Sequence, residues 1–293
     1  MRIIFIGSVK FSESALLRLI DLKVEIVGIG TVKSSKFNSD HVNLSYIAKK
    51  NNIDFFYFTD INNEDSVNWI KNKYPDIIFC FGLSKIIKSD ILAIAPMGVL
   101  GFHPTLLPSN RGRHPIIWSL ALGLVKTGST FFFMDDGVDS GDILVQDKIT
   151  IDSKDDAETL YNKITNIALL QISSFIPKLI SGSYDRIKQN HSKANYWRKR
   201  QYSDGQIDWR MSSKMIYNLV RSLTKPYVGA HFVYKNCNFK VWSCDIVQNS
   251  KNNYEPGKVI DKIKKNFIVK TGDGAIKIKN TEPNINIKIG DYL

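Results

Sequence analysis

Residues 1–30 read MRIIFIGSVKFSESALLRLIDLKVEIVGIG, and this stretch decides the fold. The apolar runs Ile3–Ile6 and Val24–Ile29 have the length and composition of buried strands. Between them, Ser12–Leu22 places apolar residues at a helical spacing, with Ser12 as its expected N-cap. A strand, a helix and a second strand in this order predict a right-handed βαβ unit with parallel strands.

Strand and helix patterns continue to alternate through the first hundred residues. Helical spacing recurs at Leu44–Lys50 and Asn63–Lys73. Further apolar runs predict strands at Phe55–Phe58, Asp76–Phe81 and Val99–Phe102. This alternation predicts an α/β fold with a Rossmann-like, mostly parallel sheet and helices on both faces. Four more elements are expected after it: a helix at Ile116–Leu124, strands at Ser129–Met134 and Ile143–Ile149, and a long helix at Asp156–Ile180.

The last third of the chain has a different pattern. From Gly229 onward, short apolar runs alternate with turn residues, which is typical of a small barrel or sandwich. A polar, basic stretch precedes this region. We therefore predict a large α/β domain over residues 1–183, a linker over 184–210 and a smaller β-rich, barrel-like C-terminal domain over 211–293.

Composition excludes several classes of protein. Hydrophobic residues make up 43% and charged residues 23% of the chain, which is ordinary for a globular protein. No apolar run reaches the ~18 residues of a membrane span, and the start turns polar too soon for a secretory signal. The three cysteines, Cys80, Cys237 and Cys244, have no metal-ligand spacing. We expect a cytoplasmic protein with reduced thiols and no membrane association.

The net charge of +12 is unevenly distributed. Residues 184–293 hold 21 Lys+Arg against 9 Asp+Glu, whereas the two signs balance in residues 1–183. A basic C-terminal part suits RNA, a nucleotide diphosphate or an acidic surface as partner. A lysine-rich composition with no partner explains the same charge, so both interpretations stay open.

Residues 101–146, GFHPTLLPSNRGRHPIIWSLALGLVKTGSTFFFMDDGVDSGDILVQ, carry the candidate chemistry. His103 follows a predicted strand, and Asp139 lies in a Gly/Asp loop 36 residues later. A histidine oriented by a carboxylate is the minimal acid–base unit near neutral pH. Between them, Asn110, Arg111 and Arg113 offer an amide and two guanidinium groups to a phosphate or carboxylate.

Other common sites are disfavoured by their missing motifs. The first turn has one glycine, Gly7, and not the GxGxxG of a dinucleotide site. Neither a Walker A motif nor a Gly-x-Ser-x-Gly elbow occurs in the sequence. The acidic loop that begins at Asp135 fails the calcium spacing, because its twelfth position is Gln146. We predict no metal site.

These motifs resemble the 10-formyltetrahydrofolate-dependent formyltransferases, the family that includes methionyl-tRNA formyltransferase, glycinamide ribonucleotide formyltransferase and the sugar N-formyltransferases. The family pattern Asn-x-His-x-Ser/Thr-Leu-Leu-Pro corresponds to residues 101–108, Arg-Gly to 111–112, Thr-Gly-x-Thr to 127–130, and Asp-x-Gly-x-Asp-x-Gly to 135–141. The opening IFIGSVKFSESALLRLI and the tail segments PGKVI and TGDGAIKIK extend the likeness over nearly the whole chain. The resemblance implies an N-formyltransferase with 10-formyltetrahydrofolate as co-substrate.

The resemblance also implies roles for individual residues. His103 and Asp139 are the expected catalytic pair. Asn110, Arg111 and Arg113 are the expected substrate-binding residues. The pterin of the folate is expected along one turn and the acidic loop, at Phe81, Gly82, Leu83, Asp136, Gly137, Val138 and Gly141.

One position departs from the family pattern. The catalytic Asn of the family falls at Gly101, which has no side chain to donate a hydrogen bond to the oxyanion of the reaction. The loss of one such donor typically costs about 2.7–4 kcal/mol. Asn110, a backbone N–H and an ordered water are the candidates to replace it.

The loop after the second predicted strand bears on the formyl acceptor. The tRNA enzymes resemble one another in a long basic loop there, whereas residues 31–41 form a short loop with two lysines and an aspartate. The segments 196–200 and 204–209 look like those of sugar N-formyltransferases, where Tyr and Trp would stack on a base and Arg would pair with a pyrophosphate.

We therefore predict formyl transfer to the amine of a nucleotide-linked amino sugar, in O-antigen biosynthesis. Methionyl-tRNA is the second candidate acceptor, which makes nucleic acid the less favoured partner without excluding it. A non-catalytic module that binds folate or a nucleotide sugar is the third alternative, because the family Asn is missing. The oligomeric state, including a homodimer, stays open.

Overall fold

The computed structural model describes residues 1–35, 39–83, 85–248 and 253–293. The chain divides into two compact units. The first comprises Met1–Gly112, Thr127–Ile149 and Asn162–Trp197, and the second comprises Arg113–Lys126, Thr150–Tyr161 and Arg198–Leu293. The stretch predicted as a linker, 184–210, is thus divided between the units after Trp197. Residues 36–38 of the loop used above to compare acceptors lie outside the described residues.

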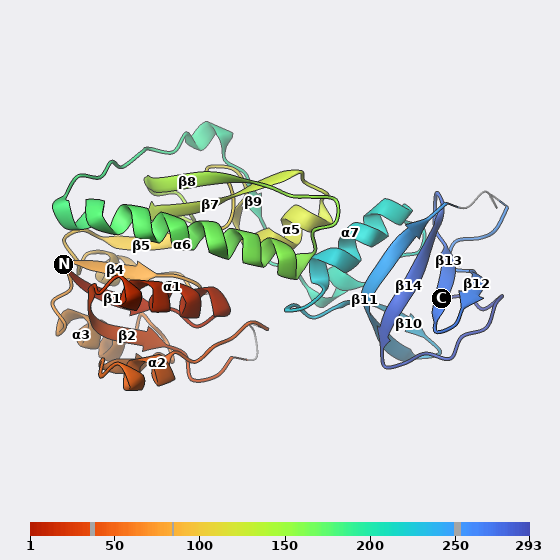
Figure 1. Ribbon diagram of the computed structural model, residues 1–293, viewed down its shortest axis with the longest axis horizontal. Helices are drawn as coiled ribbons and strands as arrows, with labels where there is room; N and C mark the ends of the chain where they lie inside the picture. The colour runs from red at the N-terminus through yellow and green to blue at the C-terminus, as the bar shows by residue number, and fades with distance from the viewer. Residues whose placement is uncertain (36–38, 84, 249–252) are drawn as a thin grey trace. The chain divides into compact units, whose positions relative to one another are not determined.

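A seven-stranded sheet forms the first unit, in the order β3-β2-β1-β4-β5-β7-β8 (Figure 1). The strands are β1 Arg2–Ile6, β2 Glu25–Thr31, β3 Phe55–Tyr57, β4 Ile77–Cys80, β5 Val99–His103, β7 Lys126–Phe133 and β8 Ile143–Thr150. The first five pair in parallel, whereas β7 runs antiparallel to β5. The predicted mostly parallel sheet is confirmed.

Helices cover both faces of this sheet. They are α1 Lys10–Asp21, α2 Ser45–Lys50, α3 Glu64–Lys71, α4 Ser89–Leu92 and α6 Ala157–Ser181. In β4, Ile78 packs with Ile70 of α3 and Ile91 of α4. The neighbouring Phe79 instead contacts Phe175 of α6, with the ring centroids 6.3 Å apart. Because successive side chains of a strand point to opposite faces, the apolar strands of this chain require helices on both sides.

Helix α1 begins before the residue predicted to cap it. Its N-cap is Val9, and Ser12 lies in the first turn, so the predicted Ser12 cap is wrong. The Ser12 hydroxyl instead donates to the carbonyl oxygen of Phe81 at 2.5 Å and accepts from the backbone N–H groups of Ser8 and Val9. A fully buried hydroxyl needs such partners, and here it ties the first turn to the end of β4.

Helix α6 passes a length and composition test for a membrane span, and it is the one helix among the described residues to do so. One such helix is weak evidence, because the core helices of many folds pass the same test. Gln171 of α6 is 4% exposed and hydrogen-bonds to Ser129 of β7 and Asp147 of β8. Phe175 of α6 packs on Phe131 of β7, with ring centroids 4.9 Å apart. These contacts are those of a core helix.

A five-stranded antiparallel sheet forms most of the second unit, in the order β10-β11-β14-β13-β12 (Figure 1). The strands are β10 Ala230–Tyr234, β11 Cys237–Val247, β12 Val259–Ile263, β13 Asn266–Lys270 and β14 Ala275–Glu282. Helices α5 Pro115–Ala121 and α7 Ser213–Leu223 belong to the same unit. A buried cluster joins Ile117 of α5, Leu219 of α7 and Val241 of β11. The predicted β-rich C-terminal domain is confirmed.

Short elements complete the chain. They are the 3-10 helices η1 His191–Lys193 and η2 Tyr202–Gly205, and the strands β6 Arg111–Gly112 and β9 Tyr196–Trp197. β6 and β9 pair in parallel, although they lie 85 residues apart in the sequence. Two-residue strands are too short for a periodic pattern, so the sequence did not predict them. Their pairing brings residues 195–197 beside the Arg-Gly motif of the candidate site.

Candidate active site

The imidazole of His103 and the carboxylate of Asp139 lie against each other in the first unit. Nδ1 of His103 is 3.5 Å from Oδ2 of Asp139. His103 ends β5, and Asp139 lies in the loop between β7 and β8. The side chain of His103 is 6% exposed and that of Asp139 19% exposed, so the pair opens to solvent on the carboxylate side. The two residues that the sequence singled out are thus brought together.

The histidine ring is fixed by a hydrogen bond at one nitrogen, Nε2, and its other nitrogen, Nδ1, faces a carboxylate. Nε2 lies 2.8 Å from the carbonyl oxygen of Asn110, which accepts only, so we assign the ring proton to Nε2. In the neutral ring, Nδ1 is then the basic nitrogen, and it faces the carboxylate of Asp139. A proton taken up at Nδ1 would convert this contact into an ion pair. The arrangement can therefore accept a proton from a reacting group and return it.

Asp139 is held through both its side chain and its backbone. The N–H of Gly112 donates to Asp139 Oδ2 at 2.8 Å, and Gln189 Nε2 donates to the Asp139 carbonyl oxygen at 2.9 Å. The φ angle of Asp139 is +51°, in the left-handed region that few non-glycine residues adopt. Gly112 has a φ of +101°, and a Cβ there would lie 2.4 Å from the carbonyl oxygen of Trp197. Glycine is thus required for this N–H to reach the carboxylate.

Gly101 occupies a packed position in β5. A Cβ at this residue would lie 2.7 Å from Cε and 3.1 Å from Cγ of Met134, and 3.1 Å from Cε1 of Phe132. Real Cβ atoms essentially never come within 3.0 Å of a heavy atom outside their own residue and its chain neighbours. The Met134 side chain therefore fills the space into which a side chain at Gly101 would extend. The space beside Gly101, where the family has an Asn side chain, is thus occupied by Met134 and is not empty.

The turn at Phe81–Leu83, predicted to contact the folate, is closely packed. Phe81 is fully buried, and its carbonyl oxygen already accepts from Ser12. Gly82 has a φ of +77°, and a Cβ there would lie 2.3 Å from Cγ2 of Val9. Leu83 is partly buried and packs against the cluster that contains Ile78 of β4 and Ile91 of α4. The side chains of Phe81 and Leu83 pack in the core. A ligand at this turn would therefore contact its backbone groups and not its side chains. The folate contacts themselves stay a prediction.

The acidic loop presents part of its predicted binding residues to solvent. Asp136, Gly137 and Val138 are exposed, the last by 45%. The Asp135 carboxylate shapes the loop by accepting from the N–H of Gly137 at 3.1 Å and the hydroxyl of Ser140 at 2.6 Å. Gly141 is buried, and a Cβ there would lie 1.8 Å from the carbonyl oxygen of Phe133. The glycine therefore anchors the loop against β7.

Arg111 does not face solvent, which argues against its predicted role in substrate binding. It is 1% exposed. Its guanidinium donates to Gln189 Oε1 at 2.7 Å and to the hydroxyl of Tyr196 at 2.8 Å, lies 3.2 Å from Nδ1 of His191, and stacks on the Tyr196 ring at 5.6 Å. A buried guanidinium with these partners supports the fold around the site. Arg111 is thus a structural residue in this geometry.

Asn110 retains a partly exposed side chain. Its Oδ1 accepts from Asn195 Nδ2 at 3.1 Å, while its backbone N–H donates to Asn195 Oδ1 at 2.8 Å. Its φ of +64° turns the carbonyl toward the ring of His103. The predicted roles of Asn110 in substrate binding and in oxyanion stabilisation stay predictions.

Arg113 and His114 belong to the second unit. His114 is the N-cap of α5 with a φ of +56°. Burial, followed by the positive charges of Arg113, Arg200 and Lys199, lowers the pKa of His114 from 6.5 to about 4, against a small opposing effect of Asp204. This ring therefore stays neutral where an ordinary histidine titrates. A group of cations around it suits an anion, in line with the predicted role of Arg113 in binding acceptor phosphates.

The depressed pKa of His114 predicts a stability change below pH 6.5. Between pH 6.5 and 4 the unfolded chain binds a proton at this residue that the folded chain does not, so the free energy of unfolding falls as the pH falls. Urea unfolding at pH 5 and pH 7 measures this change. His114→Asn removes the titrating ring and suits the left-handed backbone, so it should flatten the dependence. An equal pH dependence in the variant would contradict the assignment.

No group of three or more His, Cys, Asp and Glu side chains suitable for a metal ion occurs among the described residues. The three cysteines carry no disulfide: Cys80 and Cys244 are buried and Cys237 is exposed.

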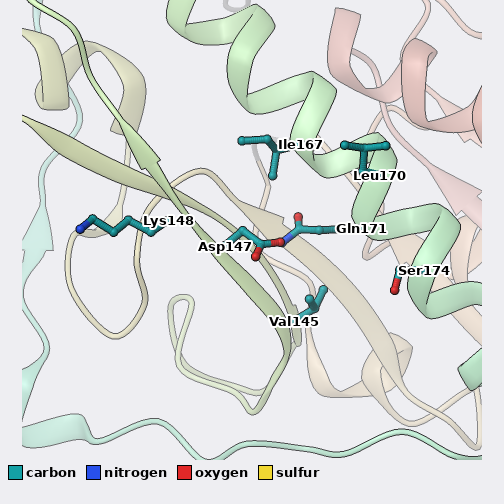
Figure 2. Close-up of a pocket in the computed structure, with 7 residues that line it drawn as sticks. All are labelled: Val145, Asp147, Lys148, Ile167, Leu170, Gln171 and Ser174. Atoms are coloured by element: carbon teal, nitrogen blue, oxygen red, sulfur yellow. The ribbon is translucent and has the colours of Figure 1, made fainter.

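A groove of about 440 Å³ lies between β8 and α6, and the residues that line it are not among the predicted site residues (Figure 2). Its lining residues are Val145, Asp147, Lys148, Ile167, Leu170, Gln171 and Ser174. Gln171 and Asp147 hydrogen-bond to each other at 2.7 Å. None of the residues predicted to act in catalysis or binding lines this groove, so we assign it no role in the chemistry.

The sequence missed the residues that hold the pair in place. Gln189, Asn195 and Tyr196 all contact the segment 110–112 or the Asp139 loop. They lie in the stretch predicted as a linker, where Tyr196 is expected from the sequence to have a different role, stacking on a base; its hydroxyl and ring contact Arg111 instead. A partner separated by 85 residues leaves no local pattern, so only the folded chain identifies these contacts.

Comparison with known proteins agrees with this geometry. A model of the formyl transferase family matches residues 1–172, and a model of the formyl transferase C-terminal domain matches residues 199–290. The methionyl-tRNA formyltransferase of Caldanaerobacter subterraneus subsp. tengcongensis is 31% identical and covers 100% of this chain, with 96% of its own length matched.

Solved structures share the fold at lower identity. The sugar 3N-formyl transferase WlaRD, solved with dTDP and 5-N-formyl-THF, has a TM-score of 0.71 at 21% identity over 97% of this chain and 99% of its own. An N-formyltransferase of Helicobacter canadensis, solved with folinic acid and dTDP-3-aminofucose, has a TM-score of 0.70 at 18% identity over 94% of this chain and 98% of its own. From the family match over most of its length and the full-length relative, the chain belongs to the formyl transferase family.

Proposed function

We propose that this formyltransferase moves a formyl group from 10-formyltetrahydrofolate to the amine of a nucleotide-linked amino sugar. The observation that carries the proposal is the contact between His103 Nδ1 and Asp139 Oδ2 at 3.5 Å, within the chain segment that matches the family. A general acid–base pair at this place is what transfer of a formyl group to an amine requires.

The folate supplies the formyl group, and the chain supplies proton movement. In the transfer, the amine nitrogen bonds to the formyl carbon while the bond from that carbon to its donor nitrogen breaks. The attacking amine must lose a proton, and Nδ1 of His103 accepts it beside the Asp139 carboxylate. The same proton then passes to the departing nitrogen. Asp139 lowers the cost of the imidazolium that exists between these two transfers.

Folate binding is inferred from relatives and from the exposed loop. The neighbours WlaRD and the Helicobacter canadensis enzyme were solved with formylated folates. In this chain, the loop at Asp136, Gly137 and Val138 is solvent-exposed, and the packed Phe81–Leu83 turn offers backbone groups. These two segments are where we place the pterin.

Two observations favour a sugar nucleotide as acceptor. The solved neighbours described above carry a sugar 3N-formyl transferase name or a bound dTDP-3-aminofucose. In the second unit, Trp118 lies under the guanidinium of Arg200 at 4.6 Å and that of Arg198 at 5.4 Å. Arg200 is 9% exposed, whereas the side chain of Arg198 is 60% exposed although it pairs with Asp204 at 2.6 Å. Arg198 and Trp118 are therefore the groups here that suit a pyrophosphate and a base.

Methionyl-tRNA is the second candidate acceptor. The relative at 31% identity is a methionyl-tRNA formyltransferase matched over the whole of this chain. The basic residues 184–293 would suit the phosphates of a tRNA. We rank this acceptor second because the short loop at residues 31–41 holds few cations.

The test is incubation of the purified chain with 10-formyltetrahydrofolate and a panel of acceptors. The panel holds nucleotide-linked amino sugars that differ in nucleotide and amine position, together with aminoacylated initiator tRNA. A mass gain of one formyl group on a sugar nucleotide supports the proposal. Formylation of the tRNA alone would make methionyl-tRNA the acceptor in place of a sugar nucleotide. The absence of product with every acceptor would favour a non-catalytic binding module.

A further inference from the structure

We propose that Gln189 is a positioning residue for formyl transfer, which acts by holding the backbone that carries Asp139. The inference rests on the proposed function, because it assigns Gln189 to the same site. Among the described residues, its side chain hydrogen-bonds to Arg111 and to the backbone carbonyl groups of Asp139 and Gly141, and not to His103 or the Asp139 carboxylate. Its action would therefore pass through Asp139.

The side chain of Gln189 ties the acidic loop at two carbonyl groups. Its Nε2 donates to the carbonyl oxygen of Asp139 at 2.9 Å and to that of Gly141 at 2.6 Å. Its Oε1 accepts from Nη2 of Arg111 at 2.7 Å. Gln189 is 6% exposed, so these hydrogen bonds are shielded from water. One amide thus joins the loop to the Arg-Gly motif.

The orientation of this amide is fixed by its partners. A guanidinium only donates and a backbone carbonyl only accepts, so the oxygen of Gln189 must face Arg111 and the nitrogen must face the loop. Both N–H groups of the amide are then used. A flipped amide would place donors against donors, and acceptors against acceptors, at all three contacts.

Arg111, which donates to the Gln189 amide oxygen, is itself held firmly in place. It is 1% exposed and is held by the hydroxyl and ring of Tyr196. Gly112, the next residue, donates its N–H to the Asp139 carboxylate. The Arg-Gly motif therefore holds Asp139 in two ways. Gly112 donates directly to its carboxylate, and Arg111 orients the Gln189 amide that donates to its carbonyl oxygen.

These hydrogen bonds matter because a small displacement of Asp139 would separate its carboxylate from His103. Its φ of +51° lies in the left-handed region, which aspartate adopts more readily than most non-glycine residues but at a cost to the backbone. Its Oδ2 stands 3.5 Å from His103 Nδ1, so a further shift would break the contact. A displacement of ~1 Å at a reacting group can cost about 10²-fold in rate.

The test is Gln189→Glu, which keeps an oxygen for Arg111 and removes both donors to the carbonyl groups. We expect kcat to fall by about 10²-fold near pH 8, with the KM of each substrate little changed. At lower pH the introduced carboxyl takes up a proton and regains one donor. The ratio of the variant's kcat to that of the wild type should therefore rise as the pH falls. A purely structural role would change the folded fraction with pH but leave the kcat of the folded enzyme unchanged.

Gln171→Glu is the matched control. Gln171 is 4% exposed and makes three hydrogen bonds, to the Ser129 carbonyl, the Ser129 hydroxyl and Asp147. Figure 2 shows Gln171 beside Asp147. This variant should lose stability in urea unfolding but keep the kcat of the folded fraction, with a flat ratio to wild type across pH. If Gln189→Glu does not fold, Gln189→Asn, which keeps the amide but shortens its reach, should also lower kcat.

The result separates this inference from the proposed function. If the wild type formylates no acceptor, the proposed function fails, and the NMR ring-proton resonances of His103 still test the positioning. We expect these resonances to move in Gln189→Glu and to stay in place in Gln171→Glu. A wild-type kcat with a pH-independent ratio, or unmoved His103 resonances in a folded Gln189→Glu protein, overturns the inference.

Discussion

In His103→Ala, kcat for formyl transfer is expected to fall by about 10²–10⁴-fold, because the imidazole is the group that we propose to take the proton from the amine. Asp139→Asn should have an effect of similar size, since an amide cannot stabilise the imidazolium that forms beside it. The Asn side chain still offers an oxygen to the N–H of Gly112, so the loop should keep its conformation. Single-turnover formylation assays of each variant measure the loss.

The control for this prediction is His231→Ala. His231 is 4% exposed, as buried as His103, and stacks on Tyr202 in the second unit at a centroid distance of 4.1 Å. It should lose stability without losing kcat. Circular dichroism and urea unfolding verify that His103→Ala and Asp139→Asn remain folded. Undiminished turnover in either of these two variants would rule out the proposed acid–base mechanism.

Gly101→Asn, taken alone, is expected to destabilise the fold without restoring the family's oxyanion donor. A side chain at Gly101 would meet Met134 at 2.7 Å and Phe132 at 3.1 Å. Overpacking of this kind costs about 1–3 kcal/mol. Met134 is flexible and can shift its terminal methyl group, but an Asn needs the space of most of that side chain. The free energy of urea unfolding should fall accordingly.

The double variant Gly101→Asn/Met134→Ala removes the obstruction. With room for its amide, the Asn can donate toward the oxyanion, and the rate of formyl transfer should rise by up to about 10²–10³-fold over the wild type. Met134→Ala alone is the control for the loss of packing. A strong gain from the single variant Gly101→Asn would show that Met134 is no obstacle. No gain from the double variant would mean that another donor already serves the oxyanion.

Most of the fold was predictable because its signals are local. The strand Ile3–Ile6 and the helix after it follow from apolar spacing within one short stretch, and both are present as β1 and α1. The exceptions are elements too short to have a period, such as α4 at Ser89–Leu92 and the β6–β9 pair. The grouping of α5 with α7 was also missed, because sequence order placed α5 in the first domain.

The site was predictable in its chemistry and not in its support. His103 and Asp139 were recognisable as acid–base residues and as positions of a family motif. Arg111 carried the same motif signal, yet its guanidinium is buried against Tyr196 and Gln189. Burial depends on which distant segments pack over a residue, and a motif does not contain that information.

By itself, the sequence determined the order of strands and helices, the family and the two groups that can move a proton. The strands and helices follow from periodicity, the two groups from their residue types, and the family from the resemblance of the motifs to known formyltransferases; all of these signals act over short stretches of chain. The tertiary structure alone decided that Met134 occupies the space beside Gly101 and that Gln189 and Arg111 hold the loop of Asp139. Such contacts join residues far apart in the chain, so they exist only once the backbone has folded.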